Sequence, residues 1–288
     1  MIIADATCLW KNKKFPIIGM MRLNFFFDID GTILPVGQHI PQSTLDAFTK
    51  AKAQGHRLFF CTGRSPFELT EELRALPFDG GVFSSGAHVV VDGKTIVHKY
   101  LTEEQRAFFF SVAERFDLLW ILQSDDGSYL TQETQDFYCD LMRSVYSRSI
   151  DFLGFNIIDT FPADKPIVKM FILSKKGLVL EARKAFEGPL HSVNNTNGLP
   201  SECAAELMAP DLTKASGIDH VLDYLGEDRA STVGIGDGEN DIEMIETCHL
   251  GIAMGNACAA LKEKADYVTS DIQADGLARA MEYAMRKN

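Results

Sequence analysis

The sequence lacks both the paired cysteines of a zinc-stabilised protein and the long apolar runs of a membrane-spanning protein. Its six cysteines, at positions 8, 61, 139, 203, 248 and 258, form no CxxC pair, and several lie within apolar segments such as residues 59–61. This spacing argues against a zinc site and favours reduced, buried thiols in a cytoplasmic protein. No apolar run approaches the roughly 18 residues of a membrane-spanning helix, so we expect no membrane partner.

Positive charge is also in short supply. The 288 residues include 28 lysines and arginines against 40 aspartates and glutamates, which gives a formal net charge of −12. An acidic surface repels the phosphates of DNA and RNA at long range, so we expect no nucleic-acid partner. The same field repels small anions, and an anionic substrate would therefore need a local cation or a metal ion.

The remaining composition is that of a globular protein, with 46% apolar and 24% charged residues. The length suits one large domain or two modest ones. Residues 1–20 contain Lys11, Lys13 and Lys14 ahead of an apolar run that is too short for a secretory signal. We expect this segment to be an N-terminal extension and the folded domain to begin near Met21.

Strand and helix patterns alternate regularly at both ends of the remaining chain. Short apolar runs that end in polar turns predict buried strands at residues 23–29, 57–61, 81–84, 231–235 and 250–254. Helices are expected between them, at residues 41–54, 65–76, 213–225, 239–248, 257–265 and 275–285. Repeated strand–helix–strand units predict an α/β fold, a doubly wound parallel Rossmann-like core with helices on both faces of the sheet.

The alternation breaks after Ser85. Residues 88–99 predict a hairpin, and the helices and strands that follow it come in irregular order. The simplest explanation is a second module inserted into the first domain. We therefore expect residues 100–190 to form an inserted α+β cap domain, while residues 21–99 and 191–288 form the Rossmann-like catalytic core.

The clearest strand of the insertion, at residues 167–173, is interrupted by Lys169. The period of two places this lysine on the same face as Ile167 and Phe171, from which it could reach an anionic substrate across the cleft. The slightly favoured alternative is an edge strand that the lysine protects from aggregation. The insertion as a whole is expected to set specificity, because it is placed to cover a bound substrate and exclude water.

An acidic pair follows the first predicted strand. Asp28 lies at its end and Asp30 two residues later, where Gly31 lets the chain turn away. Ligands of open α/β sheets bind at the carboxyl ends of the strands. One carboxylate could attack an electrophile while the other transfers protons. The alternative is a turn that merely favours aspartate and glycine.

A second acidic group, GDGEND at residues 236–241, follows another short apolar strand. Asp237 and Asp241 are hard oxygen ligands, and carboxylates from two strand ends suit Mg²⁺. Lys214 begins a predicted helix, where a cation opposes the helix dipole, so its position suggests a use beyond the helix. The plain alternatives are a solvated loop and a surface lysine.

These segments together resemble the four motifs of the haloacid dehalogenase superfamily. The motifs are DIDGT at 28–32, Thr62 within FFCTGRS, Lys214, and GDGEND at 236–241, and their order and spacing agree over most of residues 21–288. GIAMGNA at 251–257 and ADYVT at 265–269 are similar to the Cof-type branch, subfamily IIB, which inserts a large cap between the second and third motifs. Two positions depart from that branch, with Ser85 in place of the usual Asn and Ala215 in place of the usual Gly.

The resemblance implies phosphoryl transfer and a role for each motif residue. Asp28 would be the nucleophile, Asp30 the acid and base, and Thr62 and Lys214 would hold the phosphoryl oxygens. The substrate contacts would also include Gly63 and Asn240. The metal site, for Mg²⁺, would consist of Asp28, the backbone carbonyl of Asp30, Asp237 and Asp241, the last as a ligand or a neighbour of the ligands.

The leading hypothesis is a cytoplasmic, Mg²⁺-dependent phosphatase that hydrolyses small phosphomonoesters, such as sugar phosphates, through an aspartyl-phosphate. Its partner would be a small phosphorylated metabolite, and we expect a monomer or a weak homodimer. A phosphosugar mutase could use the same core and a similar cap. A non-catalytic binding protein is the third hypothesis, although the complete set of motif carboxylates argues against it. A dehalogenase is disfavoured because Asp30 is the acid and base that phosphoryl transfer needs.

Overall fold

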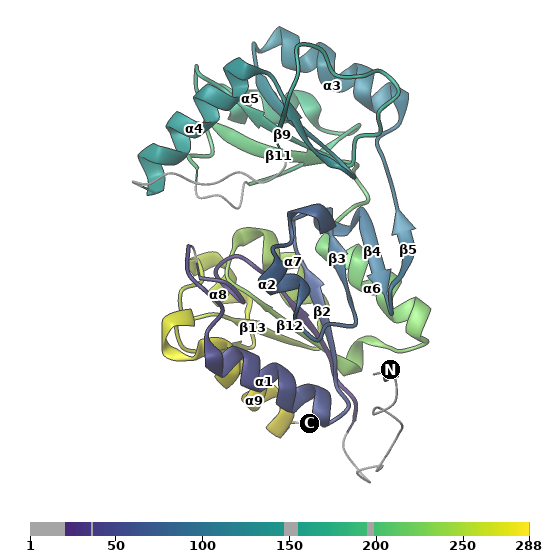
Figure 1. Ribbon diagram of the computed structural model, residues 1–288, viewed down its shortest axis with the longest axis vertical. Coiled ribbons are helices and arrows are strands. Elements are labelled where there is room, and N and C mark those ends of the chain that lie inside the picture. Colours follow the sequence, from purple (N-terminus) through teal and green to yellow (C-terminus); the bar gives the residue numbers. More distant parts are fainter. Residues whose placement is uncertain (1–20, 36, 147–154, 195–198, 288) are drawn as a thin grey trace, which may run out of the picture.

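The computed structural model describes residues 21–35, 37–146, 155–194 and 199–287, so the expected extension at 1–20 lies outside the described residues. The chain forms two lobes, each built on one sheet (Figure 1). The first sheet has the strand order β14-β13-β12-β1-β2-β3-β4-β5. Its parallel strands are β1 (Asn24–Phe27), β2 (Arg57–Cys61), β3 (Gly80–Phe83), β12 (Thr232–Gly236), β13 (Leu250–Ala253) and β14 (Tyr267–Val268). The hairpin of β4 (His88–Val91) and β5 (Lys94–His98) extends the sheet in antiparallel fashion.

Helices cover both faces of this first sheet, as the doubly wound prediction requires. One face packs against α1 (Gln42–Ala53), α2 (Glu71–Arg74), α8 (Ala259–Lys264) and α9 (Gly276–Lys287), and the other against α6 (Lys214–Leu225) and α7 (Ile242–Thr247). The three phenylalanines of β1 show the alternation directly, since Phe25 and Phe27 point to the first face and Phe26 to the second. A strand buried on both sides explains the continuous apolar run before Asp28.

The second sheet forms the cap and has the order β10-β11-β9-β6-β7-β8. Its pairs are antiparallel except for β7 with β8. The strands are β6 (Leu119–Ser124), β7 (Gly127–Leu130), β8 (Phe155–Ile157), β9 (Lys169–Leu173), β10 (His191–Asn194) and β11 (Ala204–Met208). One face packs against α3 (Glu103–Arg115) and α5 (Val179–Phe186), and the other against α4 (Gln132–Tyr146). The fold class is therefore confirmed, with a parallel core sheet and a mixed cap sheet.

The cap sheet differs from the sequence prediction in two ways. First, β10 and β11 pair with it, so the insertion extends to about residue 208, beyond the expected limit at 190. The sequences of these short strands show no clear alternation of apolar and polar residues. The strands can be recognised only from their pairing with neighbouring strands of the sheet. Second, Lys169 lies on β9, which is flanked by β11 and β6, so the edge-strand interpretation of this lysine is wrong.

The helix expected at residues 65–76 is also divided. Pro66–Glu68 form one turn of 3-10 helix, Leu69 is extended, and Thr70 caps the separate helix α2. The capping box of Ser65 and Glu68 is present. Among the described residues, no helix is long and apolar enough to cross a membrane.

Candidate active site

The motif residues meet at one edge of the core sheet. Asp28, Thr62 and Asp237 each follow the last residue of β1, β2 or β12, and these strands are parallel neighbours in the order β12-β1-β2. Parallel strands end at the same edge, so their following residues converge there. The backbone N–H of Asp28 donates to the carbonyl of Ile235 at 3.0 Å, which fixes the two acidic loops side by side.

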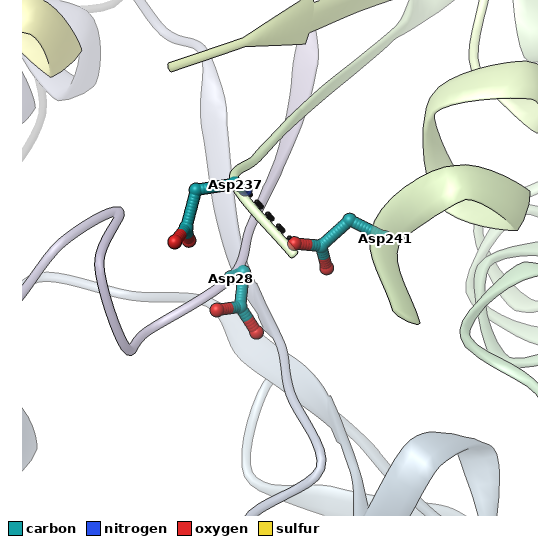
Figure 2. Close-up of side chains that lie close together, drawn as sticks. All are labelled: Asp28, Asp237 and Asp241. Carbon is teal, nitrogen blue, oxygen red and sulfur yellow. Dashed lines mark hydrogen bonds between the residues drawn. The ribbon is translucent and has the colours of Figure 1, made fainter. Parts of the chain in front are cut away.

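Three carboxylates form the centre of the site (Figure 2). Asp28, Asp237 and Asp241 each offer an oxygen within 4.8 Å of the others. The backbone N–H groups of Asp237 and Gly238 both donate to Oδ2 of Asp241 at 2.9 Å. The hydroxyl of Thr32, in the DIDGT motif, donates to Oδ1 of Asp237, in the GDGEND motif, at 2.8 Å. This hydrogen bond connects the first motif to the fourth. The arrangement has the hard oxygen donors that a divalent cation prefers.

Among the described residues, Lys214 is the one cation that forms ion pairs with this triad. Its Nζ donates to Oδ1 of Asp28 at 2.6 Å and to Oδ1 of Asp241 at 2.5 Å, and its side chain is almost fully buried. Burial works to lower the pKa of Lys214, but the charges of Asp241 and Asp28 raise it above its ordinary value. The lysine opens α6, whose N-cap Thr213 accepts from the N–H of Ser216. Its placement against the helix dipole is thus explained by two buried carboxylates.

The raised pKa values of Asp28 and Asp237 favour the binding of a metal ion. Burial raises the pKa of Asp28 well above its usual range, and the charges of Asp241, Asp237 and Asp30 add to that rise despite Lys214. Burial and then Asp241 raise the pKa of Asp237 to about 7. Carboxylates that resist ionisation next to one another are stabilised in their charged form by a divalent cation. The donor set therefore fits a metal such as Mg²⁺.

Asp30 lies beside the triad and faces a different partner. Nε and Nη2 of Arg64 donate to its two carboxylate oxygens at 2.8 Å and 2.5 Å. About 38% of the Asp30 side chain is exposed, so it faces the open side of the site while Asp28 is buried. Arg64 lies within the FFCTGRS segment of the second motif, but its pairing with Asp30 could not be read from the spacing of the residues.

Thr62 and Gly63 form a tight loop at the end of β2. Thr62 is buried, and its Oγ1 accepts from the backbone N–H of Arg64 at 3.1 Å. The carbonyl of Gly63 accepts from Nζ of Lys169, a cap residue, at 2.7 Å. The backbone N–H of Ser85 donates to the carbonyl of Thr62 at 3.0 Å, which ties the loop to the turn after β3.

Ser85 occupies a left-handed backbone conformation, with φ of 53°. Asparagine tolerates this region better than most other residues, which gives a conformational reason for the asparagine usual in the Cof-type branch. The small serine side chain lines a cavity of about 250 Å³ next to Lys214 and Asn240. The cap contributes to the same cavity, from residues Arg183, His191, Ser192, Val193, Asn194 and Met208. None of these cap residues was singled out from the sequence, since no motif marks them.

The matching sequence family is that of the haloacid dehalogenase-like hydrolases. Residues 25–281 match its sequence profile, and the chain belongs to this family. The cap sheet and its place between the second and third motifs make the fold that of the Cof-type subfamily IIB.

Several individual relatives are phosphatases by name. The chain is 30% identical over 257 residues to the "Putative phosphatase YkrA" of Bacillus subtilis, covering 89% of this chain and 95% of that protein. It is 24% identical over 270 residues to the 5-amino-6-(5-phospho-D-ribitylamino)uracil phosphatase YitU of the same organism, covering 88% and 93%. A solved structure of a subclass IIB sugar phosphatase superposes with a TM-score of 0.75 at 25% identity, covering 91% of this chain and 98% of the other. The chain is therefore similar to phosphatases that act on different substrates.

Proposed function

We propose that this protein is a Mg²⁺-dependent phosphatase of small phosphomonoesters that works through an aspartyl-phosphate. The observation that carries the proposal is the pairing of the buried Asp28 carboxylate with Lys214, inside a triad of acids at the sheet edge. A purely structural loop has little reason to bury the two carboxylates of Asp28 and Asp241 around one ammonium group. The family assignment supports hydrolysis as the reaction class.

The chain supplies each group that this reaction needs. Asp28 attacks phosphorus, and its carboxylate becomes the acyl phosphate as the bond to the leaving oxygen breaks. Asp30 gives its proton to the leaving oxygen and then accepts one from the water that cleaves the intermediate. Lys214 and Thr62 hold the phosphoryl oxygens, with Gly63 and Asn240 beside them.

Asp30 must be protonated for the first step, and Arg64 is in position to control this. Nε and Nη2 of Arg64 donate to both carboxylate oxygens of Asp30. A substrate that uses Asp30 as its proton donor must therefore displace at least one of these bonds.

The donor set fits Mg²⁺, which would be held by Asp28, Asp237 and the backbone carbonyl of Asp30. Asp241 is better suited to orient the loop, because its oxygens already accept from Lys214 and from two backbone N–H groups. When bound, the metal would neutralise charge between the nucleophile and the phosphoryl group. Coordination of the metal by Asp241 would require those contacts to break, so we assign Asp241 to the loop.

Sugar phosphates are the substrate class that we favour. The cavity beside Lys214 and Asn240 is lined largely by polar side chains of both lobes, which suit hydroxyl groups. One structural relative is a sugar phosphatase, and a sequence relative acts on a phosphorylated ribityl compound. We also expect a cytoplasmic protein, since the described cysteines are free, and a monomer or weak homodimer.

A panel of phosphorylated metabolites, read by release of inorganic phosphate, tests the proposal. We expect turnover with Mg²⁺, none in chelator, and recovery when Mg²⁺ is restored. Full turnover in metal-free buffer would contradict the metal assignment. Turnover of no phosphomonoester would instead favour a non-catalytic binding protein.

The same panel separates a phosphatase from a phosphosugar mutase. A mutase returns the phosphoryl group to the sugar, so isomerised sugar phosphate would accumulate without free phosphate. We expect free phosphate in amounts equal to the substrate consumed. Product analysis by phosphorus NMR distinguishes the two reactions directly.

A further inference from the structure

The cap reaches the phosphoryl-binding loop through one buried lysine. Lys169 and Glu206 form an ion pair with 3.0 Å between Nζ and Oε2, and only 5% and 3% of the two residues is exposed. The same Nζ donates to the carbonyl of Gly63 in the core at 2.7 Å. A side chain of the cap therefore bonds directly to the backbone of the loop that follows β2.

The cap sheet presents these groups on one face. Gln123, Lys169 and Glu206 lie on the adjacent strands β6, β9 and β11, and each shares its face with the apolar residues that pack under α4. Gln123 and Lys169 are direct partners in the register, and Gln123 donates to Oε1 of Glu68 in the core at 3.1 Å. Polar residues thus replace apolar ones where the core, and not α4, covers the sheet.

The ion pair lies within van der Waals distance of the loop at Gly63. A Cβ atom there would lie 3.5 Å from Nζ of Lys169 and 3.6 Å from both Oε2 of Glu206 and Oγ of Ser85. The ion pair is therefore packed against the loop backbone itself. Burying such a pair is commonly no more stabilising than an apolar pair of similar volume, so its presence favours a role in positioning.

The peptide group between Gly63 and Arg64 is held at both ends. Its carbonyl accepts from Lys169, and its N–H donates to Oγ1 of Thr62 at 3.1 Å. A donor that occupies one lone pair of the Thr62 oxygen restricts the directions left for its hydroxyl proton. Fixing this peptide from the cap therefore fixes the direction in which Thr62 can donate.

We propose that Lys169 is a positioning residue, which orients the Gly63–Arg64 peptide from the cap and thereby aims the Thr62 hydroxyl at the phosphoryl group. This inference rests on the proposed phosphatase function. Glu206 holds the ammonium group in place, and the contact forms only where the cap meets the core. The phosphoryl site is accordingly complete only when the cap is seated on the loop.

Binding of inorganic phosphate in the presence of Mg²⁺, measured by calorimetry, tests this role without turnover. Lys169→Met should weaken phosphate binding about tenfold, the usual effect of one lost hydrogen bond. Lys175→Met is the matched control, because Lys175 is a cap lysine paired with Glu133 on the exposed surface. Its phosphate affinity should match that of the wild type. Unchanged affinity in Lys169→Met would overturn the proposal.

A double-mutant cycle locates the effect. If Lys169 acts through the Thr62 hydroxyl, Lys169→Met should lower the phosphate affinity little in a Thr62→Val background. If the two residues act independently, the fold-losses in phosphate affinity should multiply in the double variant. Lys169→Arg keeps a donor for the Gly63 carbonyl and should restore part of the affinity. Losses that multiply would contradict the proposed path.

The choice of substrate separates positioning from direct recognition. A role at the phosphoryl site predicts the same proportional loss of kcat/KM for p-nitrophenyl phosphate and for a sugar phosphate. A loss confined to the sugar phosphate would mean that Lys169 contacts the leaving group, and would overturn the proposal.

Amide hydrogen exchange keeps the inference testable even if no substrate is found. The N–H of Arg64 should exchange faster in Lys169→Met than in the wild type or in Lys175→Met, because the peptide is no longer held at its carbonyl. Unchanged exchange of this amide would overturn the inference. Normal exchange together with a lack of all phosphatase activity would count against both conclusions, whereas faster exchange without activity would count only against the enzyme function.

Discussion

Lys214 is the single residue on which the site's charge balance depends. It is buried between the carboxylates of Asp28 and Asp241 and bonded to both. Its removal leaves two buried acids without a counter-charge in the metal-free protein. An uncompensated buried charge is among the most costly defects that a folded chain can contain.

We predict that Lys214→Met lowers the free energy of unfolding of the metal-free protein by about 3–5 kcal/mol. Urea denaturation measures the change, and Mg²⁺ should offset part of it by replacing the lost charge. Lys264→Met is the control, because Lys264 forms an exposed ion pair with Glu246. Such surface pairs contribute about 0–1 kcal/mol. Equal stability of the two variants would show that the buried cluster does not need its cation.

The two acids of the first motif should differ sharply when substituted. Asp28→Asn removes the nucleophile, so turnover and trapped acyl phosphate should both disappear. Asp30→Asn keeps the nucleophile and the backbone carbonyl, and should lower kcat about 10²–10⁴-fold. Rapid quench and mass spectrometry detect the covalent phosphate. Near wild-type turnover by Asp28→Asn would rule out the covalent route.

The raised pKa of Asp237 predicts how stability depends on pH. Between the ordinary carboxyl value of 3.8 and its own value of about 7, the folded protein keeps a proton that the unfolded chain releases. The folded state therefore binds more protons in this range, and the metal-free protein should lose stability as pH rises through it. Thermal unfolding across this range measures the trend, which Asp237→Asn should weaken.

Magnesium should reverse that trend, because a cation binds the ionised carboxylates and competes with their protons. We expect the rise in Tm caused by Mg²⁺ to be larger at about pH 8 than at about pH 5.5, where protons occupy the site. An equal rise at both values would indicate that the cation binds elsewhere. Asp237→Asn should show a small rise at both.

At the scale of elements, the site depends on turns that hold one loop against another. Ser84, Ser85 and Gly86 all have positive φ in the turn between β3 and β4. This turn bonds to the loop after β2 and also packs against the start of α6. One short turn therefore connects Thr62 with Lys214, although neither lies within it.

Gly86→Ala tests this connection. Its φ is 102°, and a Cβ atom would lie only 2.4 Å from the carbonyl oxygen of Thr213, the residue before Lys214. We predict a loss of at least about 1 kcal/mol in the free energy of unfolding, from the conformation and the backbone contact together. A fall in kcat should accompany it, because Lys214 shifts with its helix start. Gly93→Ala also has positive φ but meets nothing within 4 Å, so it controls for conformation alone.

At the scale of the whole molecule, we expect the core lobe to carry out phosphoryl transfer and the cap lobe to select the substrate. In the proposed reaction the core motifs would contact only the phosphoryl group and the metal, so they could not distinguish one leaving group from another. The cap supplies one wall of the cavity beside Lys214. It also contacts the core through a small apolar cluster formed by Ala87, Val168 and Leu212. Specificity is therefore expected from the cap.

Exchange of the cap with that of a related phosphatase tests this division. The exchanged segment should run to about residue 208, because β10 and β11 belong to the cap sheet. We predict a new ranking of phosphomonoesters while the dependence on Mg²⁺ stays. The control is an exchange of the cap with the Lys169 and Glu206 positions preserved, which should protect phosphate binding. An unchanged substrate ranking would place specificity in the core.

The sequence alone determined most strands and helices of the core and the positions of the motif acids. Strand ends such as Asp28 and Asp237 could be located because a short apolar run bounded by glycine is a local pattern, and parallel strands bring their ends to one edge. Lys214 could be singled out because its charge conflicts with a helix start. These inferences need only neighbouring residues.

Only the tertiary structure decided which of these residues meet. The pairing of Arg64 with Asp30, the contact of Lys169 with Gly63 and the membership of β10 and β11 in the cap sheet all join segments far apart in the chain. The interior position of β9 likewise depends on β11, which follows it by about thirty residues. Partners across such distances are set by the packing of whole layers, and no local pattern of residues contains that information.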